Sequence, residues 1–139
     1  MTHKTIRIVI VLLTGFVALT AIGGGLAMFV SADRFPLEWL QGTPFVGYGI
    51  PALLLAVCVG GSSLAATVAL LARPRLGAPI AMAAGMLLTG FVVVEVLILK
   101  QVPPGPTPIE VFYICLGLLI LLLAAYFRRW QQKSASADN

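Results

Sequence analysis

The stretch Gly77–Lys100, GAPIAMAAGMLLTGFVVVEVLILK, decides what kind of protein this is. As a helix rising about 1.5 Å per residue it spans roughly 36 Å, whereas the hydrocarbon core of a bilayer is about 30 Å thick. Small residues recur in it at helical spacing, at Ala81, Gly85 and Thr89, and they let another helix approach closely. The stretch therefore predicts a transmembrane helix that packs against a neighbour. It also carries an acidic residue within the apolar run, Glu95.

The composition extends this interpretation to the whole chain. Of 139 residues, 60% are hydrophobic and 10% are charged, against about 45–50% and about 25% in soluble domains. A water-soluble core of this size cannot hide so much apolar surface. We therefore predict one integral membrane domain over residues 1–139, all-α, folded as a four-transmembrane-helix antiparallel bundle in the lipid bilayer. Its expected spans are about 7–31, 45–72, 77–100 and 108–128, followed by a polar tail at 131–139.

The basic residues lie at alternate junctions between the apolar runs. Seven of the nine are at three such junctions, and only Arg34 and Lys100 are elsewhere; the seven are Lys4, Arg7, Arg73, Arg75, Arg128, Arg129 and Lys133. The positive-inside rule then predicts a multi-pass protein of the cell (inner) membrane with both termini in the cytoplasm. A nucleic-acid partner is not expected, because the basic residues are few and flank the spans.

The first apolar run, Ile8–Val30, admits two interpretations. It is longer than the 7–15 apolar residues of a secretory signal, which favours an uncleaved anchor. Val30-Ser31-Ala32 nevertheless resembles a small-residue cleavage site, so a signal peptide stays open. Gly23 and Ala27 share one helix face with Ser31, and we expect this face to pack on a neighbouring helix.

The outer loop Asp33–Pro44, DRFPLEWLQGTP, is amphipathic. It predicts a short surface helix at about Leu37–Gln41, with Trp39 at the level of the lipid headgroups. The loop would serve either as a cap over the bundle or as a lid that contacts a ligand or partner. Tyr48 follows near an irregular entry to the second span.

Glu95 is the main functional candidate, because an ionisable residue inside a span is a functional hypothesis by default. Two structural roles compete with this: the side chain reaches the headgroups, or it pairs with Arg34. In the functional alternative Glu95 lies in an outward-facing polar pocket. The candidate ligand-binding residues are Glu95, Arg34, Trp39, Tyr48 and Phe35.

The links between spans also carry expectations. The turn Ala72–Leu76 is so short that the second and third spans must form a helical hairpin, and their small residues predict the tightest interface of the bundle. Thr107 is the expected N-cap of the fourth span, with Glu110 in its first turn. The Leu-rich fourth span should face lipid more than the others.

Catalytic, metal and cofactor sites are not expected. The sequence holds no phosphate-binding loop, no nucleophile elbow and one histidine, His3, near the terminus. Cys58 and Cys115 lie at different predicted depths, so they predict small buried hydrophobes and not a disulfide.

The run PFVGYGIPALLLAVCVGG, followed by an arginine-containing inner turn, resembles small uncharacterised four-helix bacterial inner-membrane proteins, loosely of the DoxX-like group. This resemblance implies the four-helix outline and carries over no catalytic residue.

Two functional hypotheses follow. The first is a non-enzymatic accessory or partner-binding module, with a possible homo-oligomer or membrane protein partner. The alternative is a small transporter or lipophilic-ligand-binding protein that uses Glu95. A membrane enzyme is the weakest hypothesis, because chemistry needs a constellation of groups and one carboxylate is present.

Overall fold

The computed structural model describes residues 2–30, 47, 49–98 and 107–137, and all regular structure in these residues is helical. The elements are α1 (His3–Val30), α2 (Gly49–Leu54), the π-helix η3 (Leu55–Gly60), α3 (Gly61–Ala72), α4 (Pro74–Ile98) and α5 (Pro108–Ala137). Because α2, η3 and α3 follow one another without a break, the chain forms four long helices. Each is long and apolar enough to cross a membrane. The predicted all-α four-helix bundle is confirmed.

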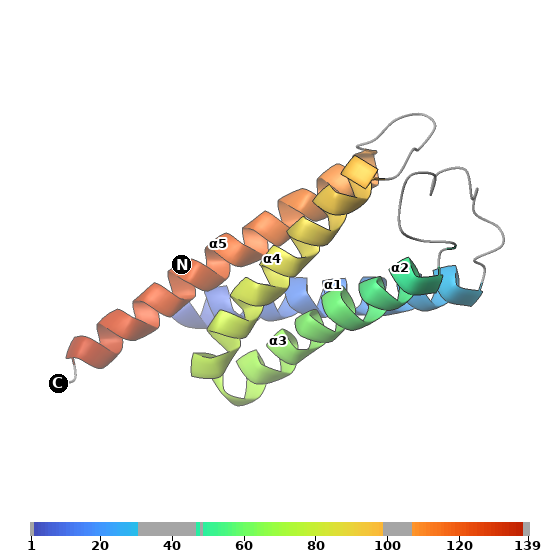
Figure 1. The fold of residues 1–139 in the computed structure, drawn as a ribbon. Coiled ribbons are helices and arrows are strands. Elements are labelled where there is room, and N and C mark those ends of the chain that lie inside the picture. The colour runs from blue at the N-terminus through green and yellow to red at the C-terminus, as the bar shows by residue number, and fades with distance from the viewer. Residues whose placement is uncertain (1, 31–46, 48, 99–106, 138–139) are drawn as a thin grey trace.

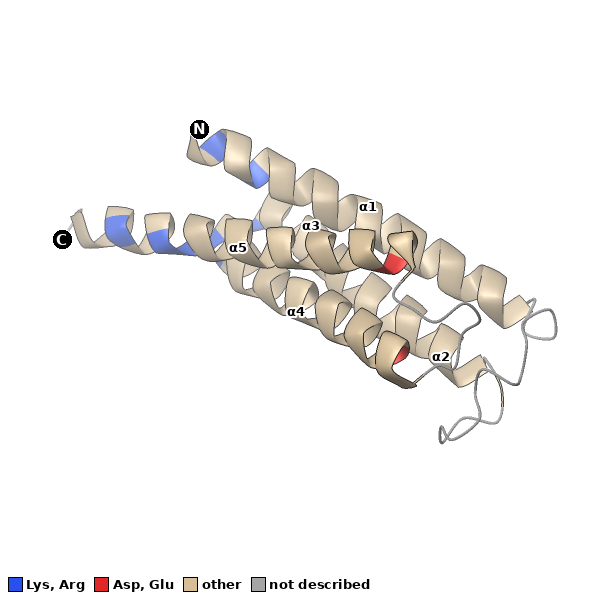
Figure 2. Ribbon diagram, turned by 90° about the horizontal axis from the view of Figure 1, so that it is seen from above, with Lys and Arg blue, Asp and Glu red and all other residues tan. Residues whose placement is uncertain are grey.

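The four helices associate as two pairs (Figure 1). The α4 helix lies along α5, and α1 lies along α2, η3 and α3. The pairs meet where α3 turns into α4 and diverge toward the other end (Figure 1). We call the first end, which carries Arg7, Arg73 and Arg75, the basic end. The opposite end carries Glu95 and Glu110 and is called the glutamate end (Figure 2).

The outer surface of the bundle is apolar. Large hydrophobic side chains such as Leu12, 67% exposed, and Leu97, 77% exposed, point away from the neighbouring helices. Water would penalise such a surface, whereas lipid tails solvate it. The α5 helix buries the smallest share of its apolar window, which confirms the prediction that it faces lipid most.

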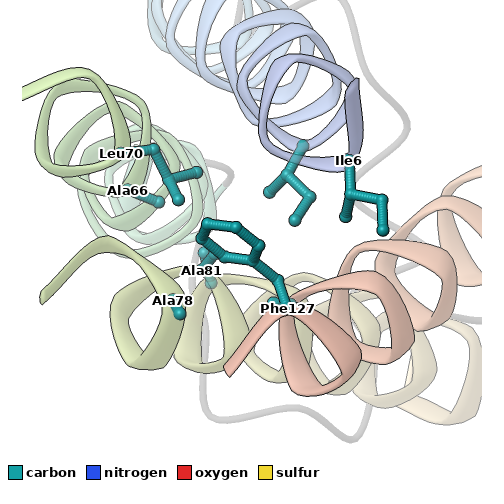
Figure 3. Close-up of a cluster of buried hydrophobic side chains, with 9 residues drawn as sticks. Ile6, Ala66, Leu70, Ala78, Ala81 and Phe127 are labelled. Atoms are coloured by element: carbon teal, nitrogen blue, oxygen red, sulfur yellow. The ribbon is translucent and has the colours of Figure 1, made fainter. Parts of the chain in front are cut away.

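A core of nine buried side chains closes the basic half of the bundle (Figure 3). It draws Ile6 from α1, Leu70 from α3 and Phe127 from α5 around the small residues Ala78 and Ala81 of α4. The close approach of α3 and α4 depends on Gly77, where a Cβ would lie 2.6 Å from the backbone nitrogen of Leu70. A side chain larger than hydrogen at Gly77 would hold α3 and α4 apart.

The second and third spans do not form the most extensive interface, so that prediction is wrong: α1 contacts the continuous helix α2–η3–α3 more extensively, and so does α4 with α5. A Cβ at Gly85 would lie 2.7 Å from the carbonyl oxygen of Gly117, so the two backbones touch. Thr89 completes this contact, since a Cβ at Gly117 would collide with its hydroxyl. Gly85 and Thr89, two of the small residues of α4 identified in the sequence, pack closely against α5, whereas Gly77 packs closely against α3.

The first helix also packs through a different residue from the one expected. At Gly25 a Cβ would lie 2.7 Å from the carbonyl oxygen of Ala52 and 2.8 Å from the Cβ of Ala56. Gly23 has nothing within 4 Å of its Cβ position, and Ala27 is exposed. The Gly23–Ala27 face therefore does not pack on another described helix, and the prediction for these two residues is wrong.

Hydroxyl groups link α1 to α3 near the middle of the bundle. The Oγ1 atoms of Thr14 and Thr67 lie 2.8 Å apart, and the Thr67 hydroxyl donates to the Ser63 carbonyl at 2.9 Å. Such bonds between transmembrane helices contribute about 0.6 kcal/mol on average. The link fixes the register of the two helices more than it stabilises them.

The ends of the helices differ from the sequence-based boundaries. The α4 helix begins at Pro74 and not at Gly77, and α5 continues to Ala137, well past the predicted end at 128. The cap of α5 is confirmed: the Thr107 backbone N–H donates to Glu110 Oε2 at 2.7 Å, and the Glu110 N–H donates to Thr107 Oγ1 at 3.4 Å. These reciprocal bonds form a capping box.

Candidate functional site

A cavity of about 410 Å³ lies at the glutamate end, where the two helix pairs diverge. One wall consists of residues from α1, α2 and η3: Met28, Pro51, Leu54, Leu55, Cys58 and Val59. The other wall belongs to α4: Met86, Leu87, Gly90, Phe91, Val94, Glu95 and Ile98. The volume falls within the roughly 300–1,000 Å³ range of small-molecule sites.

Glu95 is the charged member of this otherwise apolar lining. It lies on the last two turns of α4 and is half-buried, so one side of its carboxylate faces the cavity. No ion pair joins Glu95 to another described residue, and the described Lys and Arg residues lie at the opposite end of the bundle (Figure 2). The Glu95 carboxyl group therefore has no cationic partner within residues 2–30, 47, 49–98 and 107–137.

The two halves of α4 carry side chains of different size. From Gly77 to Gly85 the buried face is built of glycine and alanine, and neighbouring helices come close. From Phe91 onward the helix carries an aromatic and then successive valines. Val92 packs in a buried cluster with Val59 of η3, whereas Phe91 and Val94 line the cavity together with Gly90, which has no side chain to fill it.

The π-helix η3 shapes the opposite wall. The Gly61 N–H lies in hydrogen-bonding range of the Ala56 carbonyl, five residues earlier, as the wider π turn requires. Three lining residues, Leu55, Cys58 and Val59, belong to this segment. Short π segments often occur at functional sites, because the extra residue in the turn redirects side chains.

The structure describes one of the five predicted site residues. Glu95 lines a cavity, but the rest of its described lining is apolar, whereas the hypothesis specified a polar pocket. Arg34, Phe35, Trp39 and Tyr48 lie outside the described residues. The ion pair of Glu95 with Arg34 and the aromatic part of the predicted pocket therefore stay predictions.

Sequence reasoning missed most of the lining. Met28 and Met86 face one cavity from two helices, and methionine suits a surface that must adapt to an apolar molecule. Their pairing depends on the rotation of α1 relative to α4, for which a single sequence holds no signal. The prediction that both cysteines are buried was wrong, because Cys58 and Cys115 are exposed on the bundle; both are free thiols.

The arrangement can bind, but it does not assemble a reaction centre. An apolar cavity next to one carboxylate accommodates a hydrophobic body and favours a cation or hydrogen-bond donor at one edge. In the part of the chain that the structure describes, no three His, Cys, Asp or Glu residues gather as metal ligands.

The comparisons with known proteins add no relative. No protein-family model matches the chain, and neither a curated protein nor a solved structure is significantly similar to it.

Proposed function

We propose that this multi-pass membrane protein binds a lipophilic molecule with a cationic group in the cavity between α4 and η3. The observation that carries the proposal is the position of Glu95 on the wall of an apolar cavity of about 410 Å³. The apolar lining supplies contact area for the body of the ligand, and the carboxylate supplies its counter-charge. In this proposal the site lies toward the outer face of the inner membrane and both termini are cytoplasmic, as the positive-inside rule predicts.

Charge selectivity tests the role of Glu95. Tetraphenylphosphonium and tetraphenylborate have nearly the same shape and opposite charges, so they separate charge recognition from hydrophobic partitioning. We expect tetraphenylphosphonium to raise the melting temperature of the purified protein in neutral detergent, and tetraphenylborate not to do so. In Glu95→Gln the affinity for the cation should fall about tenfold, equivalent to about 1.4 kcal/mol. Equal responses of wild type and Glu95→Gln to both ions would exclude this role.

Filling the cavity provides an independent test that keeps Glu95 in place. Gly90 lines the cavity, and nothing lies within 4 Å of its Cβ position, so Gly90→Leu adds a side chain to the binding space. Gly61 is also helical, has equally open space and lies outside the lining, so Gly61→Leu is the matched control. The first variant should lose tetraphenylphosphonium binding and the second should keep it. Loss of binding in both would point to partitioning into the detergent-covered surface.

A second candidate function, association with another copy or with a membrane protein partner, is supported by the open face of α1. Gly23 and Gly24 have no neighbour within 4 Å of their Cβ positions, so a flat backbone surface faces lipid. Gly23→Leu should dissociate such an assembly, whereas Gly15→Leu would act on the inner contact with Thr67. Unchanged mass of Gly23→Leu by light scattering in detergent would remove this candidate.

A further inference from the structure

A second cavity, of about 640 Å³, lies at the basic end, far from Glu95. Its walls come from the start of α1, the link between α3 and α4, and the last turns of α5. Arg7 lines it from α1, and Arg73 and Arg75 line it from the link between α3 and α4, together with His3 and Trp130. Neither the predicted site nor the proposed function uses these residues.

The charges around this cavity are of one sign. Among the described residues, Lys and Arg gather at this end and Glu95 and Glu110 lie at the other (Figure 2). No described carboxylate forms an ion pair with Arg7, Arg73 or Arg75. Each guanidinium keeps its charge at any ordinary pH and presents several N–H donors. Three uncompensated cations facing one space favour an anion there.

The backbone adds to this positive field. The Arg73 carbonyl accepts the first N–H groups of α4, from Leu76 and Gly77, each at 3.0 Å, so Arg73 is the N-cap of that helix. The N-terminus of a helix of 25 residues therefore opens on the cavity. The N-terminal dipole of α4 favours negative charge at this position, and the C-terminus of α3 at the same link offsets part of this effect.

Aromatic and apolar groups form the other side of the cavity. The His3 and Trp130 rings stack with their centroids 4.1 Å apart, and the Phe127 and Trp130 rings stack with their centroids 6.4 Å apart. Phe127 also belongs to the apolar core of the basic half. Arginines and apolar rings in one lining match a lipid headgroup, whose phosphate lies beside its acyl chains.

We propose that the cavity at the basic end binds a phosphate oxyanion, as carried by the headgroup of an anionic phospholipid, with Arg7, Arg73 and Arg75 as its counter-charges. Guanidinium groups suit this ligand, because their N–H donors match two oxygens of one phosphate. A basic pocket between transmembrane helices at the cytoplasmic surface is a typical place for anionic lipid. This binding is independent of the Glu95 cavity and of its ligand.

The test uses the full chain, stripped of lipid in neutral detergent, and three probes. Dioctanoyl-phosphatidylglycerol carries the charge and the tails, dioctanoyl-phosphatidylcholine carries the tails without net charge, and glycerol 3-phosphate carries the phosphate alone. We expect phosphatidylglycerol to raise the melting temperature more than phosphatidylcholine. The variant Arg73→Gln/Arg75→Gln should bind it about 25-fold more weakly, from about fivefold for each arginine.

Two matched comparisons separate a site from diffuse surface charge. Arg128→Gln/Arg129→Gln removes the same charge at the same end from residues outside the lining, and it should bind like wild type. Gln131→Glu places an anion within the lining, and should abolish the response while raising the melting temperature without lipid. Gln132→Glu makes the same change on the next residue, outside the lining, and should have little effect on either measurement.

Each outcome decides the proposal. Stabilisation by phosphatidylglycerol but not by glycerol 3-phosphate would identify the ligand as a lipid headgroup. Equal stabilisation by both would identify it as a soluble phosphate ester. Both results support an oxyanion site. Equal weakening in the two double-arginine variants, or in Gln131→Glu and Gln132→Glu, overturns it. Absence of any stabilisation by the two phosphate anions also overturns it. Should Arg73→Gln/Arg75→Gln fail to fold, the Gln131 and Gln132 pair still gives this answer.

Discussion

The two halves of α4 differ in packing: the first lies in close contact with neighbouring helices, and the second borders a cavity. Its first half, from Gly77 to Gly85, buries glycine and alanine against α3 and α5. Its second half, from Gly90 to Ile98, buries Val92 and places Gly90, Phe91, Val94, Glu95 and Ile98 along a cavity. The second half carries the larger and more apolar side chains, so hydrophobicity does not explain why it packs less closely. Side-chain size does, because association between helices in lipid depends on close packing and not on expulsion of water.

The largest expected effect comes from placing the same large side chain in each half. In Gly77→Leu the new Cβ would lie 2.6 Å from the Leu70 backbone, so α3 and α4 must separate. The free energy of unfolding should fall by about 3 kcal/mol. Gly90→Leu meets open space and should stay within about 1 kcal/mol of wild type. Unfolding titrations in mixed micelles measure the free energy of unfolding of both variants. Equal losses in the two would show that the two halves of α4 are packed equally closely.

A smaller effect is expected from removing side chains. Leu70 is fully buried at the basic end, and Leu70→Ala should lower the free energy of unfolding by about 2 kcal/mol through lost packing. Leu97, on the second half of α4, is 77% exposed. Leu97→Ala therefore shortens a side chain that contacts mainly lipid, and it removes little packing within the bundle. Its stability should not change measurably by the same titration. A similar loss in both variants would mean that the glutamate end is packed by a further partner.

The smallest effect concerns the start of α5 at the glutamate end. Thr107→Ala removes one half of the capping box and should lower the free energy of unfolding by about 1 kcal/mol. Amide hydrogen exchange in the first turn of α5 should rise, while exchange around Phe127 at the basic end should stay unchanged. Faster exchange at both ends would show that the two ends unfold together, which would blur the distinction between them.

The fold was predictable from the sequence because its decisive signals are local. Four long apolar runs and the short ARPRL turn needed no knowledge of which helices touch. The Thr107 cap was found for the same reason, since both partners lie within one turn. The pairing of the helices was not predictable. Small residues at Gly85 and Thr89 indicate close contact with another helix, but the sequence does not indicate that this helix is α5 and not α3.

The candidate site was predicted only through its charge. Glu95 stood out because a carboxylate in an apolar run is unusual, and it does line a cavity. The π-helix opposite it left little trace in the sequence beyond the Gly60-Gly61 pair at its end. The basic cavity was not predicted for another reason. The positive-inside pattern explains why its arginines lie at one end of the bundle, but it does not indicate that they line a common cavity.

The two cysteines differ in their position relative to the cavity beside Glu95, so their reaction with a thiol reagent can report whether that cavity is occupied. Cys58 lines the cavity beside Glu95, whereas Cys115 is exposed on α5 away from it, and both thiols are free. A membrane-permeant maleimide should therefore react at the two positions at rates that respond differently to an occupant, slowly at both because hydrocarbon disfavours the thiolate. Slower alkylation of Cys58 against a constant Cys115 would measure occupancy in native membranes, without purification, added tags or a known ligand.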